Sequence, residues 1–405
     1  MDVTRCHNIG DFRRLAKRRL PAPLFHYIDG GADDEVTLRN NTSTFDTCRL
    51  VPDALADLSQ MDLSTTVLGQ NIDWPVFLSP TGMSRLFHHD GERAAARAAA
   101  SLGTMYTLST MSTVSIEDIG ALNAAPKCFQ IYIHKDRELT FEFVQRARDA
   151  KFSALALTVD TLVAGNRERD RVTGMVMPPR LTISSFLSFA THFDWAYRYL
   201  THEKFELANV ASRIRSGTDS LTSVIDYVNS QFDRTVTWSD AEQLIAQWNG
   251  PFAIKGIMSV GDARRAVDIG ATAIMISNHG GRQLDGAAAP FEMLPAIADA
   301  VGDQIEIILD GGVRRGSHVL KALAMGARAC MIGRGYLYPL AAAGQVGVER
   351  ALTLLRDEIE RNMILMGCAS LSQLDRSKVC FPDALAGGPA TDGSSADVGD
   401  IRAVA

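Results

Sequence analysis

The chain has 405 residues and a formal net charge of −6, which suits one barrel-sized core or two ordinary domains. Acidic and basic residues are mixed without a basic block, so nucleic acid is not indicated as a partner. The six cysteines are scattered without C-x-x-C spacing, which favours free thiols in a reducing compartment and predicts no metal site.

The first residues carry no sign of export, because they lack the apolar stretch of a secretory signal. No uninterrupted apolar run reaches the roughly 18 residues that would span a membrane. We therefore expect a cytoplasmic protein. At the other end, residues 383–405 are rich in Gly, Ala, Ser and Asp and lack a hydrophobic period, so they are predicted to form a disordered tail.

Short apolar runs recur along the chain, and stretches with helical spacing lie between them. The runs are residues 76–79, 105–108, 128–132, 154–159, 252–255, 273–276, 305–309 and 329–332, and the helix-like stretches include 92–102, 137–150, 260–269, 291–300 and 317–325. Nearly continuous apolar runs are typical of parallel strands that are buried on both faces. Their alternation with helices predicts an α/β fold, a (β/α)₈ TIM barrel over residues 1–382. A doubly wound sheet is the alternative, weakened because no G-x-G-x-x-G follows the first strand.

Polar residues fall at or near the carboxyl ends of these predicted strands. They are Ser79, Pro80, Thr81, Gly82, Ser109, Gln130, Thr158, Asp160, Lys255, His279, Asp310, Gly333 and Arg334. One such residue is more often a helix cap or a turn. Because a barrel builds its active site at this end, so many polar residues there predict an extended polar ligand.

The alternation breaks between the fourth and fifth predicted strands, over residues 173–236. This insertion is far longer than an ordinary loop, and its aromatic residues are mixed with histidine, lysine and arginine. Such a mixture fits a lid over the active site or an interfacial contact with a membrane. An insertion that packs on its own barrel, or in an oligomer contact, fits the pattern equally well.

Glycine-rich turns follow the last two predicted strands. Asp310-Gly311-Gly312-Val313-Arg314 follows the seventh strand, and Gly333-Arg334 closes the eighth. Backbone N–H groups and arginines in these two places are typical of the phosphate site of a TIM barrel, although two tight turns would look the same. Lys255 ends a buried strand, and its ammonium calls for an anion such as a reduced flavin ring, unless it reaches the rim of the barrel.

The segment Ser277–Asp285 directly follows the sixth predicted strand. It places the imidazole of His279 and the guanidinium of Arg282 at the carboxyl end of that strand. A base with a near-neutral pKa beside a carboxylate-binding fork is what removing hydrogen from a 2-hydroxy acid requires. Asp160 is a candidate to orient and stabilise this imidazole. The alternatives are a turn histidine, a solvent-exposed arginine and a helix-capping aspartate.

From about Thr4 to Pro382 the chain resembles the FMN-dependent 2-hydroxy acid oxidising enzymes. The resemblance is carried by Ser277–Asp285 together with Tyr27–Ala32, Pro80–Gly82, Thr107–Ser109, Phe129–Tyr132, Thr158–Asp160, Ile254–Gly256 and Asp310–Gly312. Because so many motifs occur in the same order, the probability of a chance likeness is very small. The long insertion is similar to that of the bacterial respiratory L-lactate dehydrogenases, which associate with the membrane surface.

The resemblance implies FMN as cofactor and a role for each matching residue. His279 would be the base with Asp160 behind it, and Arg282 and Arg167 would hold the substrate carboxylate with Tyr27 and Tyr132. The implied cofactor-binding residues are Pro80, Thr81, Gly82, Ser109, Gln130, Thr158, Lys255 and Ser277 near the ring or ribityl chain, and Asp310, Gly311, Gly312, Arg314, Gly333 and Arg334 near the ribityl chain and phosphate.

Two departures refine the expected reaction. Glycolate oxidases carry a tryptophan where this chain has Met111, which lacks the indole donor and disfavours glycolate. Gly82 replaces an alanine of many oxidases and favours a dehydrogenase. We expect oxidation of an L-2-hydroxy acid, L-lactate first, with electrons passed to a quinone or cytochrome.

Several alternatives and associations accompany this expectation. An oxidase that makes hydrogen peroxide is one alternative, and an FMN enzyme with another class of substrate is a second. The resemblance also implies a homo-oligomer, a tetramer, and a peripheral contact of the 173–236 insertion with the cytoplasmic face of the inner membrane.

Overall fold

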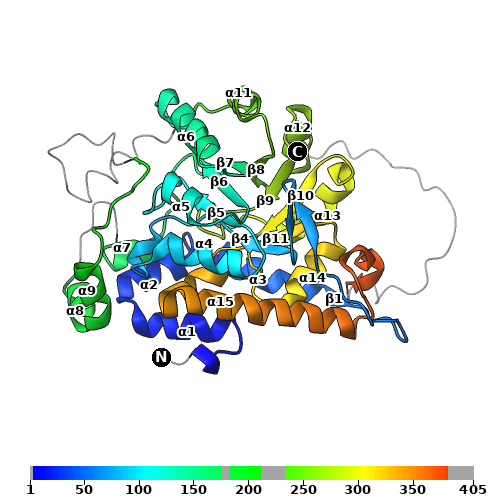
Figure 1. Cartoon of the computed structure of the whole chain (residues 1–405), viewed down its shortest axis with the longest axis horizontal. Helices are drawn as coiled ribbons and strands as arrows, with labels where there is room; N and C mark the ends of the chain where they lie inside the picture. Colours follow the sequence, from blue (N-terminus) through cyan, green and yellow to red (C-terminus); the bar gives the residue numbers. More distant parts are fainter. Residues whose placement is uncertain (1–2, 176–181, 211–232, 382–405) are drawn as a thin grey trace, which may run out of the picture.

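A closed barrel of parallel strands forms the centre of the molecule (Figure 1). The computed structural model describes residues 3–175, 182–210 and 233–381. Within them the barrel strands are β4 (Val76–Leu78), β5 (Tyr106–Ser109), β6 (Lys127–Ile131), β7 (Ala154–Thr158), β8 (Phe252–Ile257), β9 (Ala273–Ile276), β10 (Glu306–Asp310) and β11 (Ala329–Ile332). Strand β11 pairs with β4 and closes the ring. The predicted TIM barrel is confirmed, with its strands in the predicted places.

The strands read as continuous apolar runs because both of their faces are buried. In β7, Ala154 and Ala156 belong to the cluster inside the barrel, whereas Leu155 and Leu157 belong to the cluster between the strands and the helices. Successive side chains of a strand point to opposite faces, so β7 turns its alanines to one cluster and its leucines to the other.

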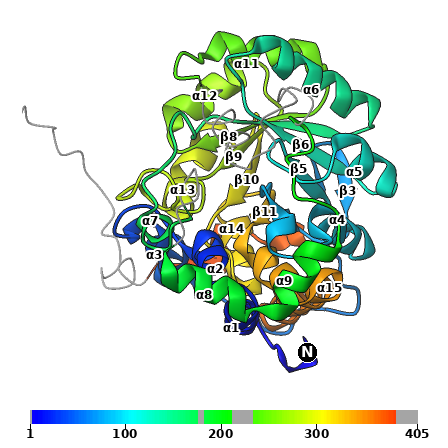
Figure 2. The same ribbon diagram turned by 90° about the vertical axis from the view of Figure 1, so that its left-hand side faces the viewer.

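Helices surround the barrel on its outer side (Figures 1 and 2). They are α4 (Gly91–Ser101), α5 (Ile116–Leu122), α6 (Arg137–Asp149), α11 (Trp238–Trp248), α12 (Val260–Asp268), α13 (Pro290–Val301), α14 (Gly316–Ala324) and α15 (Arg334–Leu365). Side chains of Ser115, Asp136 and Ser259 accept backbone N–H groups at the starts of α5, α6 and α12. The five predicted helical stretches match α4, α6, α12, α13 and α14 within two residues at either end.

The amino-terminal segment packs against one end of the barrel and along α15 (Figure 1). It contains the helices α1 (Ile9–Arg19), α2 (Ala22–Asp29) and α3 (Val36–Ser43). Smaller elements are β1 (Arg49–Leu50) paired with β12 (Val379–Cys380), the hairpin β2 (Thr65–Val67) with β3 (Gln70–Ile72), and the 3₁₀ turns Val3–Arg5, Thr44–Thr47, η3 (Ser84–Leu86), Leu371–Gln373 and Arg376–Lys378.

A buried carboxylate fixes the end of α2. Asp29 accepts hydrogen bonds from Arg13, from Arg169 Nη1 at 2.9 Å and from the Tyr338 hydroxyl at 2.8 Å. Burial opposes its ionisation, but these donors outweigh burial and lower the pKa of Asp29 to about 2. The ionised carboxylate therefore joins α1, α2, α15 and the segment after β7.

The chain between β7 and β8 contains α7 (Glu168–Val172), α8 (Ile183–Thr191) and α9 (Phe193–Thr201). Helices α8 and α9 lie beside α2 at one side of the molecule (Figure 2). Residues 176–181 and 211–232 of the predicted 173–236 insertion lie outside the described residues, as does the predicted tail at 383–405. The limits of the insertion and its role as a lid stay predictions. Among the described helices, none combines the length and the apolarity that crossing a bilayer requires.

Candidate active site

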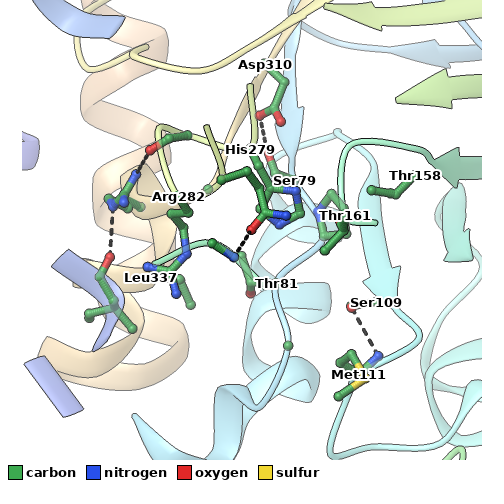
Figure 3. Close-up of a pocket in the computed structure, with 18 of the residues that line it drawn as sticks. Ser79, Thr81, Ser109, Met111, Thr158, Thr161, His279, Arg282, Asp310 and Leu337 are labelled. Carbon is green, nitrogen blue, oxygen red and sulfur yellow. Dashed lines mark hydrogen bonds between the residues drawn. The ribbon is translucent and has the colours of Figure 1, made fainter. Parts of the chain in front are cut away.

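A cavity of about 560 Å³ opens at the carboxyl ends of the barrel strands (Figure 3). Most of the predicted site residues line it: Tyr27, Pro80, Thr81, Gly82, Ser109, Gln130, Tyr132, Thr158, Arg167, Lys255, His279, Arg282, Asp310, Gly311, Gly312, Arg314, Gly333 and Arg334. The two that do not, Asp160 and Ser277, contact lining residues from behind. The structure therefore brings together side chains that are up to 307 positions apart in the sequence, from Tyr27 to Arg334.

The imidazole of His279 faces this cavity and is held from behind by Asp160. His279 Nδ1 lies 2.8 Å from Asp160 Oδ1, and the backbone of His279 has a φ of +57°. Its backbone N–H also donates to Ser277 Oγ at 3.1 Å. Burial disfavours the charge on Asp160, yet the contact with His279 and the positive charge of Lys255 keep the pKa of this carboxyl below its usual value. With Nδ1 engaged, Nε2 is the ring nitrogen left for a ligand.

Two guanidinium groups of the same cavity lie close to one aromatic ring. Arg167 and Arg282 each place their guanidinium carbon 5.0 Å from the centre of the Tyr27 ring. Arg282 also donates to the backbone carbonyls of Tyr27 and Gly30, at 2.6 and 3.1 Å. Burial and the charge of Arg167 lower the pKa of Arg282 to about 9. Such a concentration of positive charge is suited to a carboxylate.

Lys255 belongs to a buried network that connects four strand ends. Its Nζ lies 2.8 Å from Asp310 Oδ2 and donates to Ser277 Oγ at 2.9 Å. Asp310 also accepts from Ser277 at 2.9 Å and from Ser79 at 2.7 Å. Although burial lowers it, the pKa of Lys255 is raised by Asp310 and Asp160. Lys255 is thus buried and does not reach the rim, and Asp310 supplies an anion for its ammonium within the chain. The contact of Lys255 with the flavin ring stays a prediction.

Unpaired polar groups line the wall formed by β5, β6 and β7. Ser109 Oγ donates to Gln130 Oε1 at 3.1 Å, but Gln130 Nε2 and Thr158 Oγ1 are buried without a hydrogen-bond partner among the described residues. Buried polar groups in proteins are nearly always paired, so these two indicate a polar ligand. Together with Lys255 they suit the polar edge of a flavin ring. The side chains present therefore fit FMN.

The glycine turns after β10 and β11 form the opposite part of the site. Gly312 has a φ of +76°, and a Cβ atom there would lie 1.6 Å from the carbonyl oxygen of Asn41. Gly333 precedes the first turn of α15, whose N–H groups can face an anion. Arg314 lines the cavity, and its pKa is lowered by burial. A cationic, glycine-rich turn of this kind fits a phosphate.

Arg334 forms hydrogen bonds within the chain that the sequence did not suggest. Its guanidinium donates to the carbonyls of Ile28, Gly280 and Gly30 at 2.8, 2.8 and 2.7 Å. It thereby joins the end of α2 to the loop that carries His279. Its contact with a phosphate stays a prediction.

Several lining residues were missed in the sequence. Met83, Phe87 and Met175 add apolar surface, and Asp170 adds a carboxylate. Asp170 stands three positions after Arg167, a spacing that puts two residues on one face of a helix. That spacing was the sequence signal from which Asp170 could have been predicted. The three apolar residues had no such signal, since in the sequence they look the same as residues of the hydrophobic core.

Gly312→Ala is expected to abolish binding of the expected flavin, because no small shift removes a contact of 1.6 Å with a backbone oxygen. The matched control is Gly270→Ala: Gly270 also has a positive φ, +82°, but nothing lies within 4 Å of its Cβ position. Flavin absorbance per protein measures the outcome. Full flavin content in the Gly312 variant would contradict the assignment of this turn.

Comparisons with known proteins agree with this geometry. The chain matches the FMN-dependent dehydrogenase family over residues 16–381. It is 42% identical over 365 residues to an L-lactate dehydrogenase of Alcaligenes faecalis, which covers 90% of this chain and 96% of that protein. It is 40% identical over 372 residues to glycolate oxidase 5 of Oryza sativa subsp. japonica, which covers 92% of this chain and 95% of the relative.

A solved structure extends the likeness to three dimensions. The monotopic membrane protein (S)-mandelate dehydrogenase has a TM-score of 0.89 and 35% identity, with 93% of this chain and 100% of that one covered. The resemblance seen in the motifs is thereby confirmed. The chain belongs to the family of FMN-dependent 2-hydroxy acid oxidoreductases, and FMN is its cofactor.

Proposed function

We propose that the protein oxidises L-lactate, or a closely similar L-2-hydroxy acid, to the 2-keto acid and passes the electrons to a quinone or cytochrome. The observation that carries this proposal is the His279–Asp160 pair, 2.8 Å apart, in one cavity with the guanidiniums of Arg167 and Arg282. This arrangement places a base beside a carboxylate-binding site, and oxidation of a 2-hydroxy acid requires both.

In the proposed reaction each group of the chain has one task. Arg282 and Arg167 bind the substrate carboxylate, assisted by the hydroxyls of Tyr27 and Tyr132. His279 Nε2 takes the hydroxyl proton, and the ionised Asp160 stabilises the imidazolium that results.

The cofactor is held by the remaining polar groups of the cavity. When bound, FMN supplies the acceptor for two electrons and the α-hydrogen of the substrate. Its ring would be held by Ser109, Gln130, Thr158 and Lys255 beside the Pro80–Gly82 turn. Its ribityl and phosphate groups would be held by Asp310, Gly311, Gly312, Arg314, Gly333 and Arg334.

Met111 and Gly82 support the choice of substrate and acceptor. Both line the cavity, and a Cβ atom on Gly82 would approach Met111 Cβ to 2.8 Å. The thioether lacks the indole donor of glycolate oxidases, which favours an acid with an apolar side chain over glycolate. The identity to an L-lactate dehydrogenase supports lactate.

The proposal is tested by mixing the yellow holoenzyme anaerobically with L-lactate, glycolate, L-mandelate and D-lactate. We expect L-lactate to bleach the flavin absorbance fastest and D-lactate not at all. The identity to a glycolate oxidase makes an oxygen-reducing enzyme the second candidate. Under air, that enzyme would form one peroxide per keto acid, whereas the proposed dehydrogenase reduces an added quinone or dye instead. A flavin that no 2-hydroxy acid bleaches would refute both.

His279→Ala is expected to lower the rate of flavin reduction by about 10³-fold or more, because the proton acceptor is lost. The variant should remain yellow, since the ring-binding groups are intact. His7→Ala, at an exposed histidine that does not line the cavity, is the matched control. Anaerobic stopped-flow absorbance measures both variants, and a wild-type rate in His279→Ala would exclude it as the base.

We also infer that α8 and α9 attach the enzyme to the cytoplasmic face of the inner membrane. Apolar side chains on these two helices are more than half exposed: Ile183, Phe186, Leu187, Phe193, Tyr197 and Leu200. Lys204 and Arg198 lie nearby in sequence and suit anionic headgroups. The likeness to a monotopic membrane protein, and a membrane-dissolved quinone as acceptor, both support this surface. The homotetramer stays a prediction.

Phe186→Glu combined with Phe193→Glu is expected to abolish sedimentation with phosphatidylcholine–phosphatidylglycerol vesicles while leaving lactate-dependent dye reduction unchanged. The reason is that two charges then replace exposed apolar contacts on the lipid face. Leu55→Glu, at a fully exposed leucine elsewhere, should sediment like wild type. Equal sedimentation of all three proteins would contradict the membrane contact.

A further inference from the structure

Besides Asp310, a second carboxylate lines the cavity, and this one, Asp170, has no part in the proposed reaction. It lies on α7, is 5% exposed and lines the cavity. Its Oδ2 atom is 3.1 Å from Arg167 Nε, three residues earlier in the chain. No described group donates a well-aligned hydrogen bond to that oxygen. A buried carboxylate in this state is costly, so its presence beside Arg167 calls for a reason.

The charges around Asp170 supply this reason. Burial raises the pKa of Asp170, although the positive charges of Arg167 and Arg282 act to lower it. The two guanidiniums, each 5.0 Å from the centre of the Tyr27 ring, in turn repel each other, and burial together with the charge of Arg167 lowers the pKa of Arg282. The negative charge of Asp170 acts on both guanidiniums, and it offsets part of this repulsion.

Asp170 contacts Arg167 at Nε, and this position determines which edge of the guanidinium stays open to another carboxylate. A guanidinium offers one edge formed by Nε and one Nη, and another formed by both Nη groups. A carboxylate at Nε leaves the edge with both Nη groups available. That edge can take a second carboxylate in a bidentate manner.

We propose that Asp170 is a positioning residue that fixes Arg167 through Nε, so that both Nη groups of Arg167 meet the carboxylate of the substrate. The proposal rests on the proposed 2-hydroxy acid oxidation. It assigns to Asp170 the orientation of the carboxylate-binding group rather than any proton transfer. Removing Asp170 therefore weakens the binding of an anionic substrate and has little effect on the chemical step.

The neighbouring segment explains how Asp170 itself stays in place. Arg169, between Arg167 and Asp170, turns away from the cavity and donates to Asp29 at 2.9 Å. Thr173 Oγ1 donates to the Arg169 carbonyl at 2.8 Å and closes the short helix. Because α7 is anchored on its outer side, Arg167 and Asp170 can be presented together on its inner side.

The test uses Asp170→Asn in the flavin-loaded enzyme, with anaerobic stopped-flow reduction by L-lactate. We expect the half-saturating lactate concentration to rise about tenfold and the limiting rate to change less than about threefold. Glu168→Gln is the matched control, because Glu168 is an exposed carboxylate of the same helix that does not line the cavity. It should behave as wild type. An unchanged or lowered half-saturation in Asp170→Asn overturns the proposal.

A neutral substrate separates positioning from a general structural defect. L-lactamide has no carboxylate for Arg167 to bind, so its reduction kinetics should be the same in wild type and Asp170→Asn. An equal loss for lactate and lactamide overturns the positioning role. If Asp170→Asn does not retain flavin, Asp170→Glu replaces it, with a smaller rise expected for lactate alone.

A double-mutant cycle completes the test. In an Arg167→Ala background, Asp170→Asn should cause no further rise in half-saturation, because the group that it positions is absent. Additive effects overturn the proposal. Failure of the proposed function is distinguishable, since in that case wild type itself is not bleached by any 2-hydroxy acid.

Discussion

The buried ion pair between Lys255 and Asp310 is the interaction on which the rest of the site depends. It connects the ends of β8 and β10 across β9, and Ser277 at the end of β9 contacts both partners. Ser277 Oγ also accepts the backbone N–H of His279, so the network fixes the turn in which the histidine adopts its left-handed conformation. A charge pair inside the barrel is costly unless each lone pair and proton is used, and here neighbouring strands supply the partners. The same residues thus connect three neighbouring strands of the barrel and orient the base.

The cavity combines this core with an excess of positive charge. Arg167, Arg282 and Arg314 all line it, and burial opposes the charge of each. Backbone carbonyls, the Tyr27 ring and a few carboxylates offset part of that cost in the absence of ligand. Two anions, a phosphate and a substrate carboxylate, would offset the remainder. A site arranged in this way favours anionic ligands because binding relieves a repulsion that folding alone leaves in place.

The barrel was predictable because strands buried on both faces leave apolar runs that few other structures produce. The positions of His279, Lys255 and Asp310 at the carboxyl end of the barrel followed from this prediction, since each stands at or near the end of such a run. Their partners were not predictable in the same way. A sequence indicates that Lys255 is buried, but not that a strand end 55 positions later supplies its carboxylate. Arg334 was predicted to bind a phosphate, yet its guanidinium donates to carbonyls of α2 and of the His279 turn. These contacts could not be predicted, because no local sequence pattern places the amino-terminal segment beside Arg334.

The segment between β7 and β8 is connected to the cavity wall by contacts that no local sequence pattern predicts. Trp195 of α9 donates to the Leu86 carbonyl at 2.8 Å, and Arg85 Nη1 donates to the Lys204 carbonyl at 3.1 Å. Both contacts hold η3, which is flanked by the cavity residues Met83 and Phe87. The apolar face of α9 points outward while its inner face supports this wall. The surface proposed to bind lipid and a wall of the cavity are thus opposite sides of one packed unit, so a change on one side can reach the other through η3.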